Sequence, residues 1–105
     1  MTEIEKIVSK IKLKQYEFSK HALDQSITRD ISVSEIEQAI LRNGLIIEDY
    51  PNDKYGPSCL ILGYTDNKRP LHIQCSYASR SLVKIITLYQ PGPELWINNK
   101  IRRLK

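Results

Sequence analysis

The hydrophobic period of this chain changes at Gly44, and that change constrains the fold more than any other feature of the sequence. Before Gly44, apolar residues recur at helical spacing. After it, short segments rich in β-branched residues follow one another between turns. Helices followed by consecutive strands are typical of α+β proteins. We therefore predict an α+β fold, with N-terminal helices packed on a mainly antiparallel four-stranded sheet.

Three helices are predicted before the change in period. The first covers residues 3–13. The second covers residues 20–29, where Ser19 is a good N-cap because its hydroxyl can accept from a free amide of the first turn. The third follows the capping-box pattern Ser32–Glu35, and Gly44 is expected to end it in the left-handed conformation. Their apolar faces predict core positions at Ile4, Ile7, Val8, Ile11, Ile36, Ala39 and Ile40.

Four strands are predicted after the change, and the short turns between them favour antiparallel pairing. They cover residues 45–50, 58–65, 71–77 and 82–89, whereas residues 16–18 are interpreted as an extended link between helices. A chain of 105 residues has the length of one domain, so residues 1–105 are predicted to form a single unit.

Two of these strands carry side chains of chemical interest. Alternation along residues 71–77 puts His72 on a polar face that solvent or a ligand can reach. Residues 82–89 are apolar on both sides, which predicts a central strand. Within it Ile86 and Leu88 are expected to face the core, and Thr87 and Tyr89 the opposite side.

A second polar group lies on the predicted helix 20–29. His21, Gln25 and Arg29 are spaced four residues apart and so share one helix face. Histidine can take or give a proton near neutral pH, and arginine or lysine can stabilise charge on a phosphate in a transition state. These residue types suit metal-free phosphodiester cleavage. They are equally compatible with a solvated helix face, a helix-end cation at Arg29 and a packing role for Tyr89.

Composition narrows the partners and cofactors. The net charge of +4 and the pI near 9.1 are compatible with an anionic partner such as nucleic acid. We expect a cytoplasmic protein without a membrane partner, because no long apolar run or signal-peptide pattern is present. Cys59 and Cys75 lack the spacing of a zinc motif and are expected to be reduced core residues in adjacent strands. We expect no metal or other cofactor.

Several ordered motifs resemble a small prokaryotic family catalogued as a domain of unknown function. The resemblance covers about residues 16–98 and rests on Phe18-Ser19-Lys20-His21-Ala22 followed by Arg29, on Ile47-Glu48-Asp49-Tyr50-Pro51, on Leu71-His72-Ile73 and on Ile86-Thr87-Leu88-Tyr89-Gln90-Pro91. The layout of that family is similar to the RelE-like and BrnT-like ribonuclease toxins. Its members are often encoded beside small antitoxin-like genes. The resemblance therefore implies a RelE-like toxin architecture, RNA cleavage and a cognate antitoxin.

The resemblance also implies roles for particular residues. His21 and His72 would be the acid–base pair, Arg29 would bind phosphate and Tyr89 would orient the substrate. Many relatives carry arginine where this chain has Gln25, so the cation at that point of the substrate site is either missing or supplied by Arg80 or Lys84. Apart from the resemblance, the basic end of the chain is interpreted either as a nucleic-acid contact at Lys100, Arg102 and Arg103 or as a solvated end.

Two functional hypotheses follow. The first is a toxin-like, metal-independent endoribonuclease that acts on RNA, free or ribosome-bound, as the toxin of a type II toxin–antitoxin pair. The alternative is a non-catalytic module of the same fold that binds a protein or RNA. A stand-alone small-molecule enzyme is a third interpretation, and it would need an apolar pocket of several hundred Å³.

Overall fold

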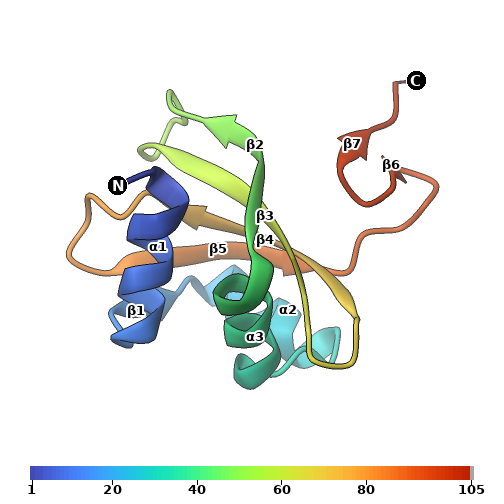
Figure 1. The fold of residues 1–105 in the computed structure, drawn as a ribbon, viewed down its shortest axis with the longest axis horizontal. Coiled ribbons are helices and arrows are strands. Elements are labelled where there is room, and N and C mark those ends of the chain that lie inside the picture. The colour runs from blue at the N-terminus through green and yellow to red at the C-terminus, as the bar shows by residue number, and fades with distance from the viewer. Residues whose placement is uncertain (105) are drawn as a thin grey trace.

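The computed structural model describes residues 1–104 and has an α+β architecture (Figure 1). Within these residues lie three helices, a five-stranded sheet and a two-stranded hairpin. In chain order the elements are α1 (Glu3–Lys12), β1 (Tyr16–Phe18), α2 (Lys20–Thr28), α3 (Val33–Asn43), β2 (Leu45–Tyr50), β3 (Ser58–Tyr64), β4 (Pro70–Ser76), β5 (Val83–Tyr89), β6 (Trp96–Ile97) and β7 (Ile101–Arg102). The predicted α+β class is confirmed. No helix among these residues is long and apolar enough to cross a membrane.

The sheet has one strand more than predicted. Its order is β1-β5-β4-β3-β2, and every neighbouring pair is antiparallel except β1 and β5. Tyr16–Phe18, expected to be a link, is β1 and pairs in parallel with Val83–Ile85. Three residues between two helices are too few to show a strand period. The strand that pairs with them lies far along the chain, so neighbouring residues do not reveal it.

The helices form where the sequence predicts them, since their starts are encoded locally. The Ser19 hydroxyl accepts from the amide of Ala22 at 3.0 Å, and the capping box of Ser32 and Glu35 is present. The predicted conformation of Gly44 was wrong. Its φ of −59° and ψ of 132° are extended rather than left-handed. A side chain is excluded there for another reason, because a Cβ would lie 2.6 Å from the Ile40 carbonyl oxygen.

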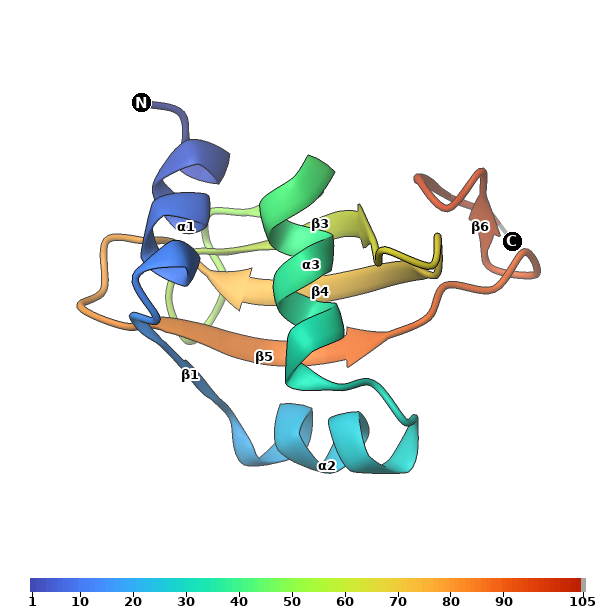
Figure 2. The ribbon, with the colours of Figure 1, turned by 60° about the horizontal axis from the view of Figure 1, so that its bottom comes forward.

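The helices take different positions on the sheet (Figure 2). α1 and α3 cover one face, where Ile7, Ile11, Ile36 and Ile40 pack on the sheet residues Ile61, Ile73 and Ile85. α2 packs against β5 and β1, beside the sheet. Cys59 and Cys75 are buried free thiols that face each other across β3 and β4, as predicted.

A β-bulge changes which residues of β5 reach the core. Cys75 pairs with Ile85 and Gln74 pairs with Thr87, so Ile86 is an extra residue on β5. Ile85 and Leu88 are fully buried, whereas Ile86 is only partly buried and lines a surface pocket. The prediction that Ile86 faces the core was therefore wrong, because strict alternation does not continue through a bulge.

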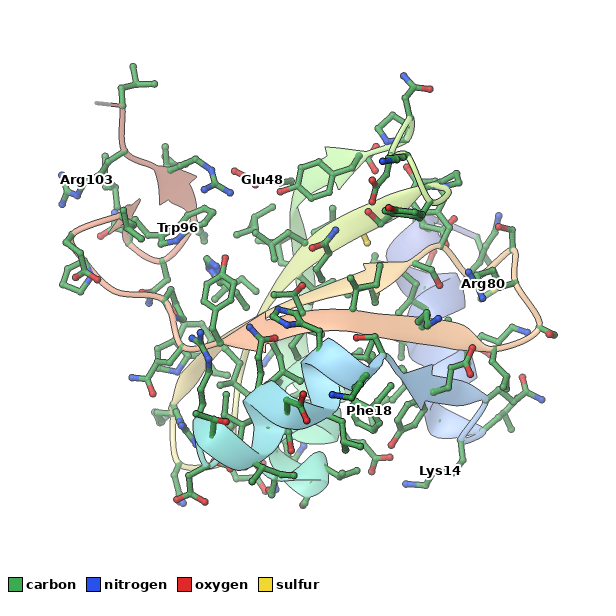
Figure 3. All side chains as sticks on the ribbon, turned by 180° about the vertical axis from the view of Figure 1, so that it is seen from behind. Lys14, Phe18, Glu48, Arg80, Trp96 and Arg103 are labelled. Carbon is green, nitrogen blue, oxygen red and sulfur yellow. The ribbon has the colours of Figure 1, made fainter. Side chains whose placement is uncertain are left out.

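The sheet face opposite α1 and α3 is called the outer face below. In register it carries His72, Gln74, Ser76, Ser58, Thr87, Tyr89 and Glu48. Figure 3 views this face and shows Trp96, on the C-terminal hairpin, and Arg80 at opposite ends of it. The candidate functional residues gather at these two ends.

Candidate functional site

A buried hydrogen-bond chain on the outer face joins His72 to Tyr89 and Asn99. His72 and Tyr89 are cross-strand partners, and Nδ1 of the imidazole lies 3.1 Å from the Tyr89 hydroxyl oxygen. Nε2 lies 2.6 Å from the carbonyl oxygen of Asn99. Because a carbonyl can only accept, Nε2 carries the proton and Nδ1 accepts from the Tyr89 hydroxyl. The surroundings thus fix one neutral tautomer of His72.

His72 is fully buried, which corrects the prediction that solvent reaches it. The ring of Trp96 packs edge-to-face on the imidazole at 4.4 Å between centroids, and the β6–β7 hairpin covers it. Asn98 and Asn99 have φ of 52° and 62° and are the central residues of the hairpin turn, which the Lys100 amide closes by donating to the Ile97 carbonyl oxygen at 3.0 Å. Strand alternation reports the face of a residue, but a distant segment decides whether that face is covered.

Burial lowers the pKa of His72 from its usual 6.5, and the hydrogen bond to Asn99 opposes that effect. The imidazole is therefore held neutral near pH 7. Tyr89 is half-buried, and burial raises the pKa of its hydroxyl, with Arg102 and Arg29 acting in the opposite direction.

An ion pair fastens the hairpin to the sheet edge. Arg102 Nη2 lies 2.9 Å from Glu48 Oε1, and the same guanidinium stacks on the Trp96 ring at 4.6 Å. The Tyr50 hydroxyl donates to Glu48. Arg102 lowers the pKa of Glu48, whereas burial and the Glu48 carboxylate raise that of Tyr50 to about 12. Glu48 and Tyr50 were not predicted as site residues, although their spacing of two on one strand indicates a shared face.

The predicted polar stripe of α2 is divided by the structure. His21 is exposed on the first turn and Arg29 is exposed at the C-cap. Gln25 instead turns toward β5, where its Oε1 accepts from the Leu88 amide at 2.8 Å. Beyond the end of β1, this amide has no strand partner, so Gln25 takes the place of a neighbouring strand. Among residues 1–104, no hydrogen bond joins His21 to His72 or Tyr89.

Replacement of Gln25 by alanine is expected to reduce stability by about 1–2 kcal/mol, because it leaves the amide of the buried Leu88 without its acceptor. Urea denaturation measures this loss as a lower unfolding midpoint. Asp24→Ala is the matched control, since Asp24 is exposed and bonded only to Lys20 at 3.4 Å. Equal midpoints for the two variants would contradict the structural role of Gln25.

Arg80 and Lys84 come together at the other end of the outer face. They line a pocket of about 420 Å³, the size of a small-molecule site. The Arg80 guanidinium approaches Glu17 only at 3.8 Å. The pocket also borders Ser76, four residues along β4 from His72, so its wall lies about 13 Å from the His72 backbone.

The predicted nucleic-acid contacts Lys100, Arg102 and Arg103 lie in and beside the hairpin. Arg103 donates to the Pro93 carbonyl oxygen at 2.7 Å, and Lys100 is exposed. The Arg102 guanidinium is also engaged, because it is bound to Glu48 and stacks on Trp96. Cations therefore occupy both ends of the outer face, and Arg102 and Arg103 are engaged within the protein.

Acidification is expected to loosen the hairpin. The pKa of Glu48 is lowered from 4.5 by Arg102, so its carboxylate stabilises the fold above pH 4.5 and this contribution is lost as the pH falls through the folded value. The pKa of His72 is lowered from 6.5 by burial, so its contribution is complete above pH 6.5 and declines as the pH falls below it. Both effects have the same sign.

Fluorescence of Trp96, the one tryptophan of the chain, measures this loosening. Its emission is expected to shift to the red between pH 7 and pH 3, and the part below pH 4.5 should disappear in Glu48→Gln. Emission that stays constant down to pH 3 would show that neither group holds the hairpin.

Comparisons with known proteins place the chain in context. A family model described as "Domain of unknown function (DUF4258)" matches residues 18–90. No curated protein and no solved structure matches the chain. The matched span contains Glu48, His72 and Tyr89, whereas the hairpin that covers them follows it. Within residues 1–104, no group of three or more His, Cys, Asp or Glu residues is arranged to hold a metal ion.

Proposed function

The chain belongs to the DUF4258 family, a domain of unknown function, and from this premise we propose that it is a toxin-like endoribonuclease that cleaves RNA by metal-independent acid–base chemistry. Its RNA would lie along the outer face of the sheet, and a cognate antitoxin would cover that face. The observation that carries the proposal is the hydrogen-bond chain from Tyr89 through His72 to Asn99.

This series of hydrogen bonds supports a route for the first proton. His72 is buried and does not touch RNA itself, but the partly exposed Tyr89 donates a hydrogen bond to its Nδ1. In the reaction the Tyr89 oxygen takes the proton of the RNA 2′-hydroxyl while its own proton passes to His72 Nδ1. The 2′-oxygen forms a bond to phosphorus, and the bond from phosphorus to the 5′-oxygen breaks. The product carries a 2′,3′-cyclic phosphate.

The leaving 5′-oxygen needs a proton, and His21 is the candidate that supplies it. Its imidazole is exposed on α2, two residues after Ser19, which lines the pocket on the outer face. Arg29, exposed at the C-cap of α2, is the candidate cation for the same site, and its charge opposes the effect of burial on the pKa of the Tyr89 hydroxyl. A guanidinium in this position would stabilise the negative charge that develops on the phosphate.

Growth after induced expression in a bacterial host tests the proposal. Wild type is expected to arrest growth, and His21→Ala should relieve the arrest at equal soluble protein. Asp24→Ala, exposed on the same helix, is the matched control and should still arrest growth. Normal growth with wild-type protein, at a level that binds RNA in the lysate, would contradict a toxin.

A non-catalytic RNA-binding module is the second candidate. The observation that favours it is the cover over His72, since Trp96 packs on the imidazole and the Asn99 carbonyl oxygen is bound to its Nε2. Such a module would bind RNA with an affinity that falls as salt rises, and it would leave the RNA intact. The measurement of cleavage by the purified protein separates the two candidates.

A further inference from the structure

The pocket that contains Arg80 and Lys84 has the chemistry of a nucleotide site rather than of a simple anion site. We infer that it holds one nucleotide of single-stranded RNA, with the phosphate on Arg80 and Lys84 and an amino-bearing base against Asp53. The inference rests on the proposed RNA binding and adds a base preference to it. The volume of about 420 Å³ falls in the range of small-ligand pockets, roughly 300–1,000 Å³.

The pocket contains separated charges of opposite sign. Arg80, Lys84 and Asp53 all line it, yet among residues 1–104 no ion pair within 4.0 Å joins Asp53 to either cation. Lys84 is half-buried and Arg80 has only the 3.8 Å contact to Glu17. Both cations can therefore face a phosphate while the carboxylate faces another part of the same ligand.

Asp53 is held in place as an acceptor. One of its oxygens, Oδ2, accepts from the Ser58 hydroxyl at 2.8 Å, and Ser58 in turn accepts from Gln74 at 3.2 Å. Because its oxygens can accept further hydrogen bonds, the carboxylate suits the exocyclic amino group of cytosine, adenine or guanine. Uracil offers a carbonyl oxygen at the corresponding position of cytosine and would be disfavoured.

Apolar and aromatic groups supply the surface for a base. The bulge on β5 turns Ile86 out of the core and into the pocket wall, where Pro57 also lies. Tyr55 stands at the rim with 81% of its surface exposed. Exposed aromatic rings are the platforms on which single-stranded bases stack. An anion site alone would need none of these groups.

The pocket lies on the same face of the sheet as the proposed cleavage site. Ser76 lines it, and His72 lies four residues back along β4 on the same face, about 13 Å away. An RNA strand along the outer face can reach both. A nucleotide fixed in the pocket would set which bond of the RNA lies at Tyr89.

Binding of labelled 2′-O-methyl pentamers of cytidine and uridine tests the inference, since these RNAs resist cleavage at the 2′-oxygen. By fluorescence anisotropy, wild type is expected to bind the cytidine pentamer about tenfold more tightly than the uridine pentamer. Asp53→Asn should reverse or abolish the preference, because its amide can donate to the uracil carbonyl. Arg80→Ser with Lys84→Ser should weaken both pentamers alike.

The outcomes separate this inference from the proposed function. Equal affinity for both pentamers, unchanged by Asp53→Asn, would overturn the base site and leave RNA binding intact. Absence of binding to either pentamer would overturn both. Affinity for free cytidine monophosphate equal to that for the cytidine pentamer would assign the pocket to a free nucleotide and overturn its place on an RNA path.

Discussion

Tyr89→Phe is expected to slow RNA cleavage by about 100-fold or more, because general acid–base catalysis typically contributes that much. The substitution removes the one hydroxyl that donates to His72 Nδ1 and keeps the ring that packs on the imidazole at 5.2 Å between centroids. RNA affinity should change little, since the cations of the outer face remain. The measurement is the single-turnover rate and the Kd of the same RNA.

Tyr77→Phe is the matched control for this prediction. The Tyr77 hydroxyl donates to Asp49, away from His72, so its removal should leave the rate unchanged. The acid limb of the wild-type rate profile is expected below pH 6.5, because burial lowers the pKa of His72 and keeps the base neutral. A Tyr89→Phe protein that cleaves RNA at the wild-type rate would exclude the proposed proton route.

The largest effect on stability is expected from Gly63→Ala. β3 passes so close to α3 that a Cβ on residue 63 would lie 1.9 Å from the Ala39 carbonyl oxygen and 2.5 Å from its carbon. Both atoms belong to the backbone of a helix and cannot turn away. We expect a loss of about 3 kcal/mol, at the upper end of overpacking substitutions.

Gly92→Ala is the control for this substitution. A Cβ on residue 92 would also meet an atom at 2.2 Å, but that atom is Oε1 at the end of the flexible Glu94 side chain. The Glu94 side chain can rotate away, so the unfolding midpoint in urea should stay near that of wild type. Similar midpoints for Gly63→Ala and Gly92→Ala would contradict the close packing of α3 on β3.

Most features of the fold that depend on neighbouring residues were predicted from the sequence. The helix starts at Ser19 and Ser32 follow from hydroxyls that accept from amides of the next turn, and Gly44 separates α3 from β2, although its backbone conformation was predicted wrongly. Features that depend on distant residues were missed. β1 needs β5 as its partner, and the bulge at Ile86 is visible only in the register with β4.

Some features of the candidate site were likewise predicted from the sequence and others were missed. His72 and Tyr89 were predicted as site residues and lie against each other. The cover over His72 was not predicted, because Trp96 and Asn99 reach it through a hairpin more than twenty residues along the chain. The hydrogen bond of Gln25 to β5 was also not predicted, since only the three-dimensional structure shows the unpaired strand edge beside it.

Incubation of purified wild-type protein with 5′-labelled single-stranded RNA in excess EDTA decides whether the protein is a metal-independent ribonuclease. We expect cleavage under these conditions and fragments that end in a 2′,3′-cyclic phosphate. Those ends follow from attack by the 2′-oxygen once Tyr89 has taken its proton. RNA that is bound but remains intact, both in EDTA and with ribosomes in a magnesium-containing buffer, would contradict a ribonuclease and leave the chain as an RNA-binding module.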